Sequence, residues 1–248
     1  MRIVTPYRPF APESQSHLRL GDFDWHDALW TLAESAKRAS GANVVQITDV
    51  DTPAGPIASL RYATTHRRLM LWILDISLAY LQSDDFDRDT VMLSPDALVF
   101  GDLTPGFRAD LGVIVRTTPK FQASGRPLLN GAQWWRVAAK ARLVAFYREV
   151  LALAETLPDD RKTWGADTDP LVALLTPVTA GLSERAGLAV YGHPEGTLFS
   201  SLRQSDADAI DAGRQPAPPA APIVDFKYLR KRHLRRYFDA TVGTAVPA

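Results

Sequence analysis

The stretch of residues 89–103, DTVMLSPDALVFGDL, constrains the fold of this 248-residue chain more than any other segment. An apolar run leads into Ser94-Pro95-Asp96, a second apolar run follows at once, and a Gly-Asp pair turns the chain. The pattern predicts a buried strand that ends at an acidic residue. A carboxylate in that position lies where open α/β sheets bind ligands, and it suits a divalent cation held against a phosphate. An aspartate that only caps a turn has the same local pattern.

Composition excludes several classes of protein. The chain is 46% hydrophobic, which predicts a packed core. It has no cysteine, so a disulfide framework, a thiolate zinc site and a cysteine nucleophile are excluded, and a cytoplasmic location is expected. No run approaches the roughly 18 apolar residues of a membrane span, so no transmembrane segment is expected. Formal net charge is zero, although the C-terminal end is strongly basic.

Strand and helix patterns alternate along the chain, which predicts an α/β sheet that is mostly parallel in its first half. The predicted strands are residues 2–5, 43–48, the two runs within 89–103, 110–116 and 188–191. The predicted helices are residues 25–40, 65–82, 134–156 and 171–175. A Pro/Ala-rich linker at 214–222 separates a main domain, residues 1–213, from a basic C-terminal segment, residues 223–248.

The order of several segments is more specific than any one of them. After the helix at 65–82 come DTVMLSPDALVFGDL, DLGVIVR, LLNGAQWWR, WGADTDPLVALL and VDFKYLRK. This order resembles the nucleotide-sugar transferases of the GT-A fold, especially the family-eight group of glycogenin and galactosyltransferase-like enzymes, over residues 44–231. The resemblance implies a GT-A-like, Rossmann-like mixed and mainly parallel sheet flanked by helices. It also implies transfer of a sugar from a nucleotide diphosphate donor, first of all a UDP-sugar, to an acceptor hydroxyl.

The chain departs from the family at its two metal-binding motifs. Where the family has Asp-x-Asp, this chain has Ser94-Pro95-Asp96, and where the family has a histidine before Phe-Lys, this chain has Asp225. The resemblance implies that Asp96 and Asp225 bind Mn²⁺ or Mg²⁺ beside Ser94, because hard cations accept all-oxygen ligation. In the alternative, metal binding is weakened and basic residues neutralise the charge instead.

The departing diphosphate needs positive charge near it. Lys227, Arg230 and Lys231 are the predicted donors, on a C-terminal segment that would fold back over the donor site. A solvated basic tail is the alternative, although the interleaved aromatic residues indicate that one side packs. The resemblance places further donor contacts after the first strand (Thr5, Pro6, Tyr7 and Arg8), at the end of the second strand (Asp49) and near a helix start (Arg68). The respective alternatives are a surface loop, a turn cap and a solvated charge.

Two further segments are predicted to meet the sugar and the acceptor. Asn130 belongs to the Asn-Gly segment that lines the sugar pocket in the resembled family, and Asp167 is the expected carboxylate near the anomeric centre. Trp134 and Trp164 are the expected acceptor contacts. Trp134 and Trp135 are adjacent, so on the expected helix one points into the core and the other is free to stack on a sugar or base.

The acceptor stays open between several classes. The basic, aromatic-interleaved C-terminal segment allows a hydroxymethylated base in phage DNA, flipped out of the duplex. It equally allows a lipid-linked or envelope saccharide, because such a segment suits an anionic membrane surface. The alternative to an enzyme is a nucleotide-sugar or nucleic-acid binding protein that has lost catalysis, and Ser94 is its main support.

Overall fold

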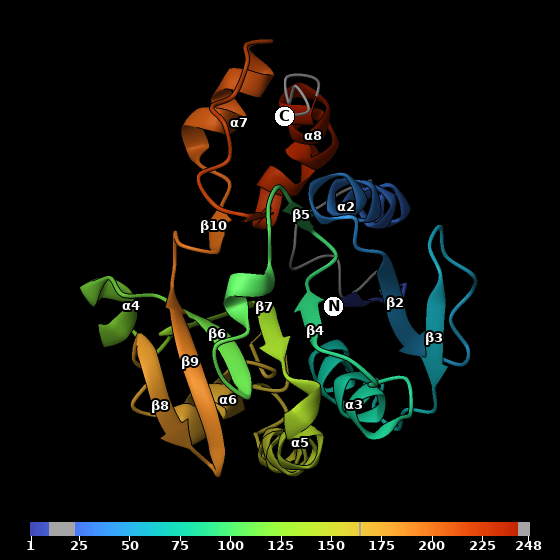
Figure 1. Ribbon diagram of the computed structural model, residues 1–248, viewed down its shortest axis with the longest axis vertical. Helices are drawn as coiled ribbons and strands as arrows, with labels where there is room; N and C mark the ends of the chain where they lie inside the picture. Colours follow the sequence, from blue (N-terminus) through green and yellow to red (C-terminus); the bar gives the residue numbers. More distant parts are fainter. Residues whose placement is uncertain (10–22, 164, 243–248) are drawn as a thin grey trace.

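The computed structural model describes residues 1–9, 23–163 and 165–242. A mixed eight-stranded sheet runs through its centre (Figure 1). In spatial order the strands are β3 (Ser59–Tyr62), β2 (Val44–Asp49), β1 (Arg2–Pro6), β4 (Thr90–Leu93), β7 (Leu128–Trp135), β6 (Leu111–Val115), β9 (Leu188–Pro194) and β8 (Gly181–Arg185). The first four are mutually parallel, whereas β7 runs antiparallel to β4 and β6, and β8 to β9. The predicted mixed, mainly parallel sheet is thus confirmed in its first half.

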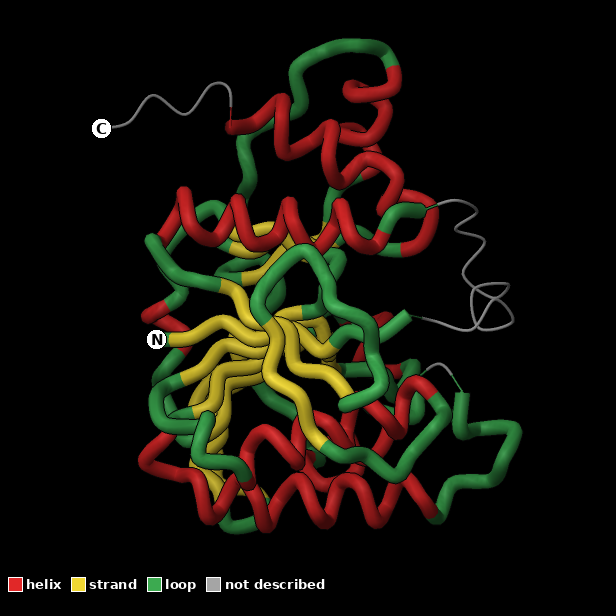
Figure 2. The backbone as a smooth tube through the Cα atoms, turned by 90° about the vertical axis from the view of Figure 1, so that its right-hand side faces the viewer, coloured by secondary structure: helices red, strands yellow, loops and turns green. Residues whose placement is uncertain are grey.

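Helices cover both faces of this sheet, as the edge-on view in Figure 2 shows. One face packs against α2 (Trp25–Ser40), and the other against α3 (Leu69–Gln82) and α5 (Lys140–Glu155). Side chains of adjacent strand residues point to opposite faces of the sheet: Ile3 packs in the core on the α2 side, and Val4 packs in the core on the α3 and α5 side. The shorter helices are η1 (Thr104–Gly106), α4 (Pro119–Ala123), η2 (Val137–Ala139) and α6 (Asp169–Leu175).

A smaller sheet and the C-terminal helices form a second packed unit at one end. Its strands are β10 (Phe199–Ser201), β11 (Ile223–Asp225) and β5 (Ala97–Val99). Around it lie α7 (Gln204–Asp211), η3 (Tyr228–His233) and α8 (Leu234–Val242). Leu98, Val224, Phe226 and Tyr237 share one apolar core. Residues 223–242 are therefore joined to the strand that directly follows the Ser94-Pro95-Asp96 turn.

Local hydrogen bonds explain where two helices begin. Asp24 accepts hydrogen bonds from the backbone N–H groups of His26 and Asp27, which caps α2 at its predicted start. The next helix begins at Leu69 rather than at the predicted Thr65. The Asp75 carboxylate accepts the backbone N–H of Thr65 at 2.7 Å, so it holds this residue in the irregular segment that precedes the helix.

The predicted helix over residues 134–156 is wrong in its first part. Trp134 and Trp135 end strand β7, and the helix starts only at Lys140. Alternation along the strand sends Trp134 into the α2-side core and Trp135 into the opposite one, and both are fully buried. Gly106 makes room for this, because a Cβ atom there would lie 2.0 Å from Trp134 Nε1.

In the part of the chain that the structure describes, no helix is both long and apolar enough to cross a membrane.

Candidate functional site

Strand register brings together the two predicted metal-binding carboxylates, which lie more than 100 residues apart in the sequence. Strand β11 runs antiparallel to β5 with Asp225 opposite Ala97, and the Phe226 N–H donates to the Asp96 carbonyl at 3.0 Å. Asp96 itself follows β4 across the Ser94 turn. The Ser94 hydroxyl donates to Asp225 Oδ1 at 3.3 Å. The three residues therefore meet at the end of β4.

The start of β7 adds the predicted sugar-pocket residues to the same place. The Ser94 N–H donates to the Gly131 carbonyl at 2.9 Å. The neighbouring Asn130 donates through Nδ2 to Asp167 Oδ2 at 2.7 Å. Gly131 is itself a point of close approach, because a Cβ atom there would lie 2.8 Å from Phe199 Cζ. Asp167 is thus held next to the strand end rather than on a free helix start.

Two lysines complete what we call the strand-end cluster. Lys231 Nζ lies 2.5 Å from Asp96 Oδ2, and both side chains are buried, with exposed fractions of 4% and 8%. Lys227 Nζ lies 2.7 Å from Asp225 Oδ2. Asp225 is fully buried, whereas the Lys227 side chain is 32% exposed. The strand-end cluster consists of Ser94, Asp96, Asn130, Asp167, Asp225, Lys227 and Lys231.

Burial and charge act against each other on these groups. Burial acts to raise the pKa of Asp96, but the charges of Lys231 and Lys227 outweigh it and lower that pKa. Burial raises the pKa of Asp225, and the negative charge of Asp96 adds to the effect. Burial acts to lower the pKa of Lys227, yet Asp225 and Asp96 together raise it. The raised pKa of Asp225 favours a neutral carboxyl group, whereas the raised pKa of Lys227 favours a charged ammonium group. We assign the ion-paired form, because Lys227 experiences two carboxylates and keeps part of its hydration.

Asp167 sits at the end of a buried relay of hydrogen bonds. The Tyr147 hydroxyl, from α5, donates to the Gln133 side-chain oxygen, and Trp135 Nε1 donates to the same oxygen at 3.0 Å. Gln133 Nε2 in turn donates to the Asn130 side-chain oxygen, and Asn130 donates to Asp167. Burial raises the pKa of Asp167, and the hydrogen bond from Asn130 opposes this rise. The relay orients one carboxylate in a dry environment, which suits a catalytic role.

The predicted base and ribose contacts gather at the ends of β1 and β2. Burial, followed by the charge of Asp24, raises the pKa of Tyr7 to about 12. The Tyr7 ring packs against Trp25, with centroids 6.1 Å apart. The indole of Trp25 also lies 4.6 Å from Lys231 Nζ, so it links this corner to the strand-end cluster.

Arg8 and Asp49 close the same corner. They form an ion pair at 3.5 Å, and the Arg8 guanidinium lies 4.8 Å from the centre of the Trp72 ring. Pro6 ends β1 just before them. The buried Thr5 hydroxyl has no hydrogen-bond partner among residues 1–9, 23–163 and 165–242.

Three predicted contacts lie apart from the strand-end cluster or inside the core. Arg68 pairs with Asp159 at 3.1 Å, and Arg230 donates to the Leu202 carbonyl at 2.6 Å. Trp134 is fully buried and donates to the Leu103 carbonyl at 3.0 Å, so its ring has no face left for an acceptor. Its acceptor role was predicted from a helix that does not form there. Trp164 lies outside the described residues.

Sequence reasoning missed four residues that shape the site. Trp25 was noted only as a helix start, and Tyr147 only as part of a helix. Gln133 was quoted only as part of the LLNGAQWW segment, and Phe199, which closes over Gly131, carries no sequence signal. A polar Gln133 between apolar strand neighbours was the available hint, because buried polar side chains need partners.

The donor set does not fit the divalent cation that the resemblance implies. Each carboxylate, Asp96 and Asp225, is paired with a lysine, and Ser94 contributes a neutral hydroxyl that is already donating. In the described ranges, no three His, Asp or Glu side chains are arranged to hold a metal ion. Mn²⁺ or Mg²⁺ stays an expectation of the family resemblance, and these residues do not support it.

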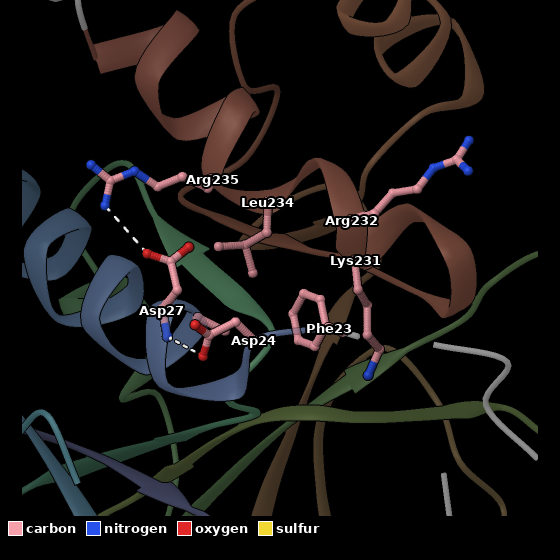
Figure 3. A pocket seen from close by; sticks show the side chains of 8 residues that line it. Phe23, Asp24, Asp27, Lys231, Arg232, Leu234 and Arg235 are labelled. Atoms are coloured by element: carbon pink, nitrogen blue, oxygen red, sulfur yellow. Dashed lines mark hydrogen bonds and ion pairs between the residues drawn. The ribbon is translucent and has the colours of Figure 1, made fainter. Parts of the chain in front are cut away.

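A hollow of about 370 Å³ lies between the start of α2 and the C-terminal helical segments, and Lys231 is one of its lining residues (Figure 3). Its lining comes from the start of α2 and from η3 and α8: Phe23, Asp24, Asp27, Ala28, Lys231, Arg232, Leu234 and Arg235. Figure 3 shows Lys231 pointing away from the other cationic side chains of the hollow. Asp24 caps α2, and Asp27 pairs with Arg235 at 3.6 Å. The charges of this hollow are therefore used largely within the fold.

Two solved structures share this fold along nearly the whole chain. One is a glycosyltransferase involved in the glycosylation of the major capsid of PBCV-1, with a TM-score of 0.53 and 14% identity, covering 94% of this chain and 98% of its own. The other is the galactosyltransferase LgtC in complex with donor and acceptor sugar analogs, with a TM-score of 0.54 and 12% identity, covering 100% and 98%. No protein-family model and no curated protein matches the chain in sequence. The chain therefore has the mixed α/β fold of the GT-A glycosyltransferases, which confirms the fold predicted from its sequence.

Proposed function

We propose that the protein transfers a sugar from a nucleotide diphosphate donor to an acceptor hydroxyl. One observation carries the proposal: Ser94, Asp96, Asp225 and the Asn130–Asp167 pair meet at the carboxyl end of β4. Open α/β sheets bind ligands at that edge. The two glycosyltransferase structures described above, which share the fold, support the same reaction class.

The donor diphosphate would lie against the strand-end cluster. Breaking the bond from the anomeric carbon to the diphosphate oxygen leaves negative charge on the departing group. Lys227 is the partly exposed cation of the cluster, so it is placed to stabilise that charge. Lys231, buried against Asp96 and Trp25, would hold the cluster in shape. Arg230 and Arg68 have internal partners and are weaker candidates for donor contacts.

Asp167 would act at the sugar. Asn130 holds its carboxylate at 2.7 Å, in a buried place where a charge developing at the anomeric centre is felt strongly. The carboxylate would stabilise positive charge there or orient the acceptor hydroxyl, and Asn130 would position it.

The base and ribose would enter beside Tyr7, Arg8 and Asp49. The unpaired hydroxyl of Thr5, within the described part of the chain, offers a hydrogen bond in this corner. A uridine nucleotide is the first donor to test, because the family resemblance implies it.

A saccharide hydroxyl is the acceptor that we propose. The LgtC structure holds an acceptor sugar analog. The alternative of a DNA acceptor rested on the basic C-terminal segment, but three of its four arginines pair with carboxylates: Arg232 and Arg236 with Asp211, and Arg235 with Asp239 and Asp27. Paired arginines offer less charge to a polyanion.

A donor panel tests the function. Nucleoside diphosphates and their sugars are screened for a rise in the thermal midpoint, because a ligand that binds only the native state raises it. Donor hydrolysis and transfer to simple sugars or to DNA are then measured with the donors that bind. We expect a midpoint shift and donor hydrolysis, both with at least one nucleotide sugar. The Asp167→Asn variant should keep the shift and lose the hydrolysis.

The same panel separates the enzyme from a protein that has lost catalysis. Binding of a nucleotide sugar with neither hydrolysis nor transfer would favour the binding protein. Failure of every nucleotide to bind would contradict both readings.

A further inference from the structure

We propose that the protein binds the donor diphosphate without a divalent cation, and that the ammonium group of Lys227 takes the place of the cation. The inference rests on the proposed function, since it concerns how the same donor is held. It departs from the metal site that the fold implies, and it comes from the pairing of charges in the strand-end cluster.

The charges of the cluster already balance. Asp96 is paired with Lys231 at 2.5 Å and Asp225 with Lys227 at 2.7 Å, so two carboxylates face two ammonium groups. A divalent cation placed between the carboxylates would stand beside both ammonium groups. Repulsion between such charges is strong at short range and is poorly screened in a buried site. The cation would first have to displace the lysines from the oxygens that it needs.

The remaining oxygen ligand is also weak. A third carboxylate would help a cation to compete with the two lysines. The chain instead has Ser94 at this place, and its hydroxyl donates to Asp225 Oδ1. A neutral hydroxyl adds no negative charge to the site. Hard divalent cations are held in proteins mainly by carboxylate and carbonyl oxygens together with water.

The two lysines differ in a way that assigns their roles. Lys231 is 4% exposed and lies on the Trp25 ring, so it has little freedom to meet a ligand. Lys227 is 32% exposed, and its ammonium group forms an ion pair with Asp225. An ammonium group has three N–H donors, so the others remain available for phosphate oxygens. Lys227 can therefore bridge the buried Asp225 and the diphosphate, which is the position that a bound cation would occupy.

Calorimetric titration of uridine diphosphate into the full chain tests the inference, with guanosine, adenosine and thymidine diphosphates alongside. Each titration is run in excess EDTA and again in excess Mn²⁺. We expect the dissociation constants in the two solutions to agree within about threefold. Lys227→Met should weaken binding about 10- to 100-fold in both solutions, because a charge-assisted contact to phosphate is lost. Lys227→Arg should retain binding.

Lys37→Met is the matched control, since Lys37 is an exposed lysine on α2 and its loss should leave binding unchanged. Circular dichroism confirms that each variant is folded, and the comparison of EDTA with Mn²⁺ on the unmodified chain does not depend on any variant. Binding that requires Mn²⁺, or that Lys227→Met leaves intact, would overturn the inference while the proposed function stands. Absence of binding by every nucleoside diphosphate in both solutions would overturn the two together.

Discussion

The ammonium group of Lys231 lies 2.5 Å from a carboxylate oxygen of Asp96, and neither side chain is more than 8% exposed. The pair joins two parts of the chain that lie far apart in sequence, the turn after β4 and the helical turn η3. Removing one partner of such a pair leaves an uncompensated charge in a dry place. The pair is therefore a structural requirement of the site, whatever it contributes to ligand binding.

We predict that Lys231→Met lowers the free energy of unfolding by about 3–5 kcal/mol, because it leaves the Asp96 carboxylate buried and unpaired. Urea denaturation followed by circular dichroism measures the change. The double variant Asp96→Asn/Lys231→Met should recover part of the loss, since it removes both charges. A double variant as unstable as the single one would show that the methionine fails for reasons of packing.

The sequence predicted the strand-end cluster better than the details of its chemistry. The apolar run that ends at an acidic residue identifies β4, and open α/β sheets bind ligands at such a strand end. Without coordinates, Asp96 was identified from this pattern, and Asp225, Asn130 and Asp167 were identified from the family resemblance. The pairing of each carboxylate with its own lysine was not, because it depends on side-chain directions around η3.

The wrong helix at residues 134–139 has a physical reason. The segment WWRVAA is compatible with a helix by propensity. In a strand covered by helices on both faces, successive side chains point to opposite faces, so both indoles are buried. Tertiary packing between the two layers of helices decides the matter, with Gly106 leaving the space that Trp134 fills. A single sequence contains no signal for the apposition of Gly106 and Trp134.

Asp167→Asn should keep or raise stability at neutral pH. Burial raises the pKa of Asp167 in the folded chain, so the folded state holds its proton to higher pH than the unfolded state. Wild-type stability should therefore fall as the pH rises from about 4, the unfolded value, through the folded pKa. The asparagine cannot ionise and can still accept the hydrogen bond from Asn130.

Urea denaturation at pH 4 and pH 8 measures this difference. The stability of Asp167→Asn relative to wild type should increase with pH. A difference that stays constant over this range would contradict a carboxyl group whose ionisation is opposed by burial.

Tyr147→Phe should slow donor hydrolysis and leave donor affinity unchanged. Tyr147 holds Gln133, Gln133 holds Asn130, and Asn130 holds Asp167, so its hydroxyl acts on the carboxylate only through this relay. Loss of one buried hydrogen bond should also cost about 1 kcal/mol of stability. The rate of hydrolysis and the donor dissociation constant are measured separately.

Tyr62→Phe is the matched control for this relay. Tyr62 donates to Asp85 at 2.7 Å, away from the strand-end cluster, so its loss should lower stability without slowing hydrolysis. Equal effects of both substitutions on hydrolysis would mean that general loosening, rather than the relay, explains the slower rate.

Asp211→Asn should increase the affinity of the protein for DNA. The Asp211 carboxylate lies 3.2 Å from Arg236, 3.5 Å from Arg232 and 3.6 Å from the buried His233 Nδ1, so it pairs with two exposed arginines at the junction of α7, η3 and α8. The asparagine releases the two arginines, which are both exposed, for phosphate contacts. Fluorescence anisotropy with a labelled duplex over a range of salt concentrations should show tighter binding and a salt slope steeper by about one or two.

Asp87→Asn gives the same change in net charge at a distance from this junction, where Asp87 pairs with Arg2 and Arg88. It should change DNA binding much less than Asp211→Asn. Strong, salt-dependent binding of DNA by the unmodified protein would show that the paired arginines remain available to a polyanion. The saccharide acceptor would then lose its main advantage over a nucleic acid, because the argument for it depends on these ion pairs.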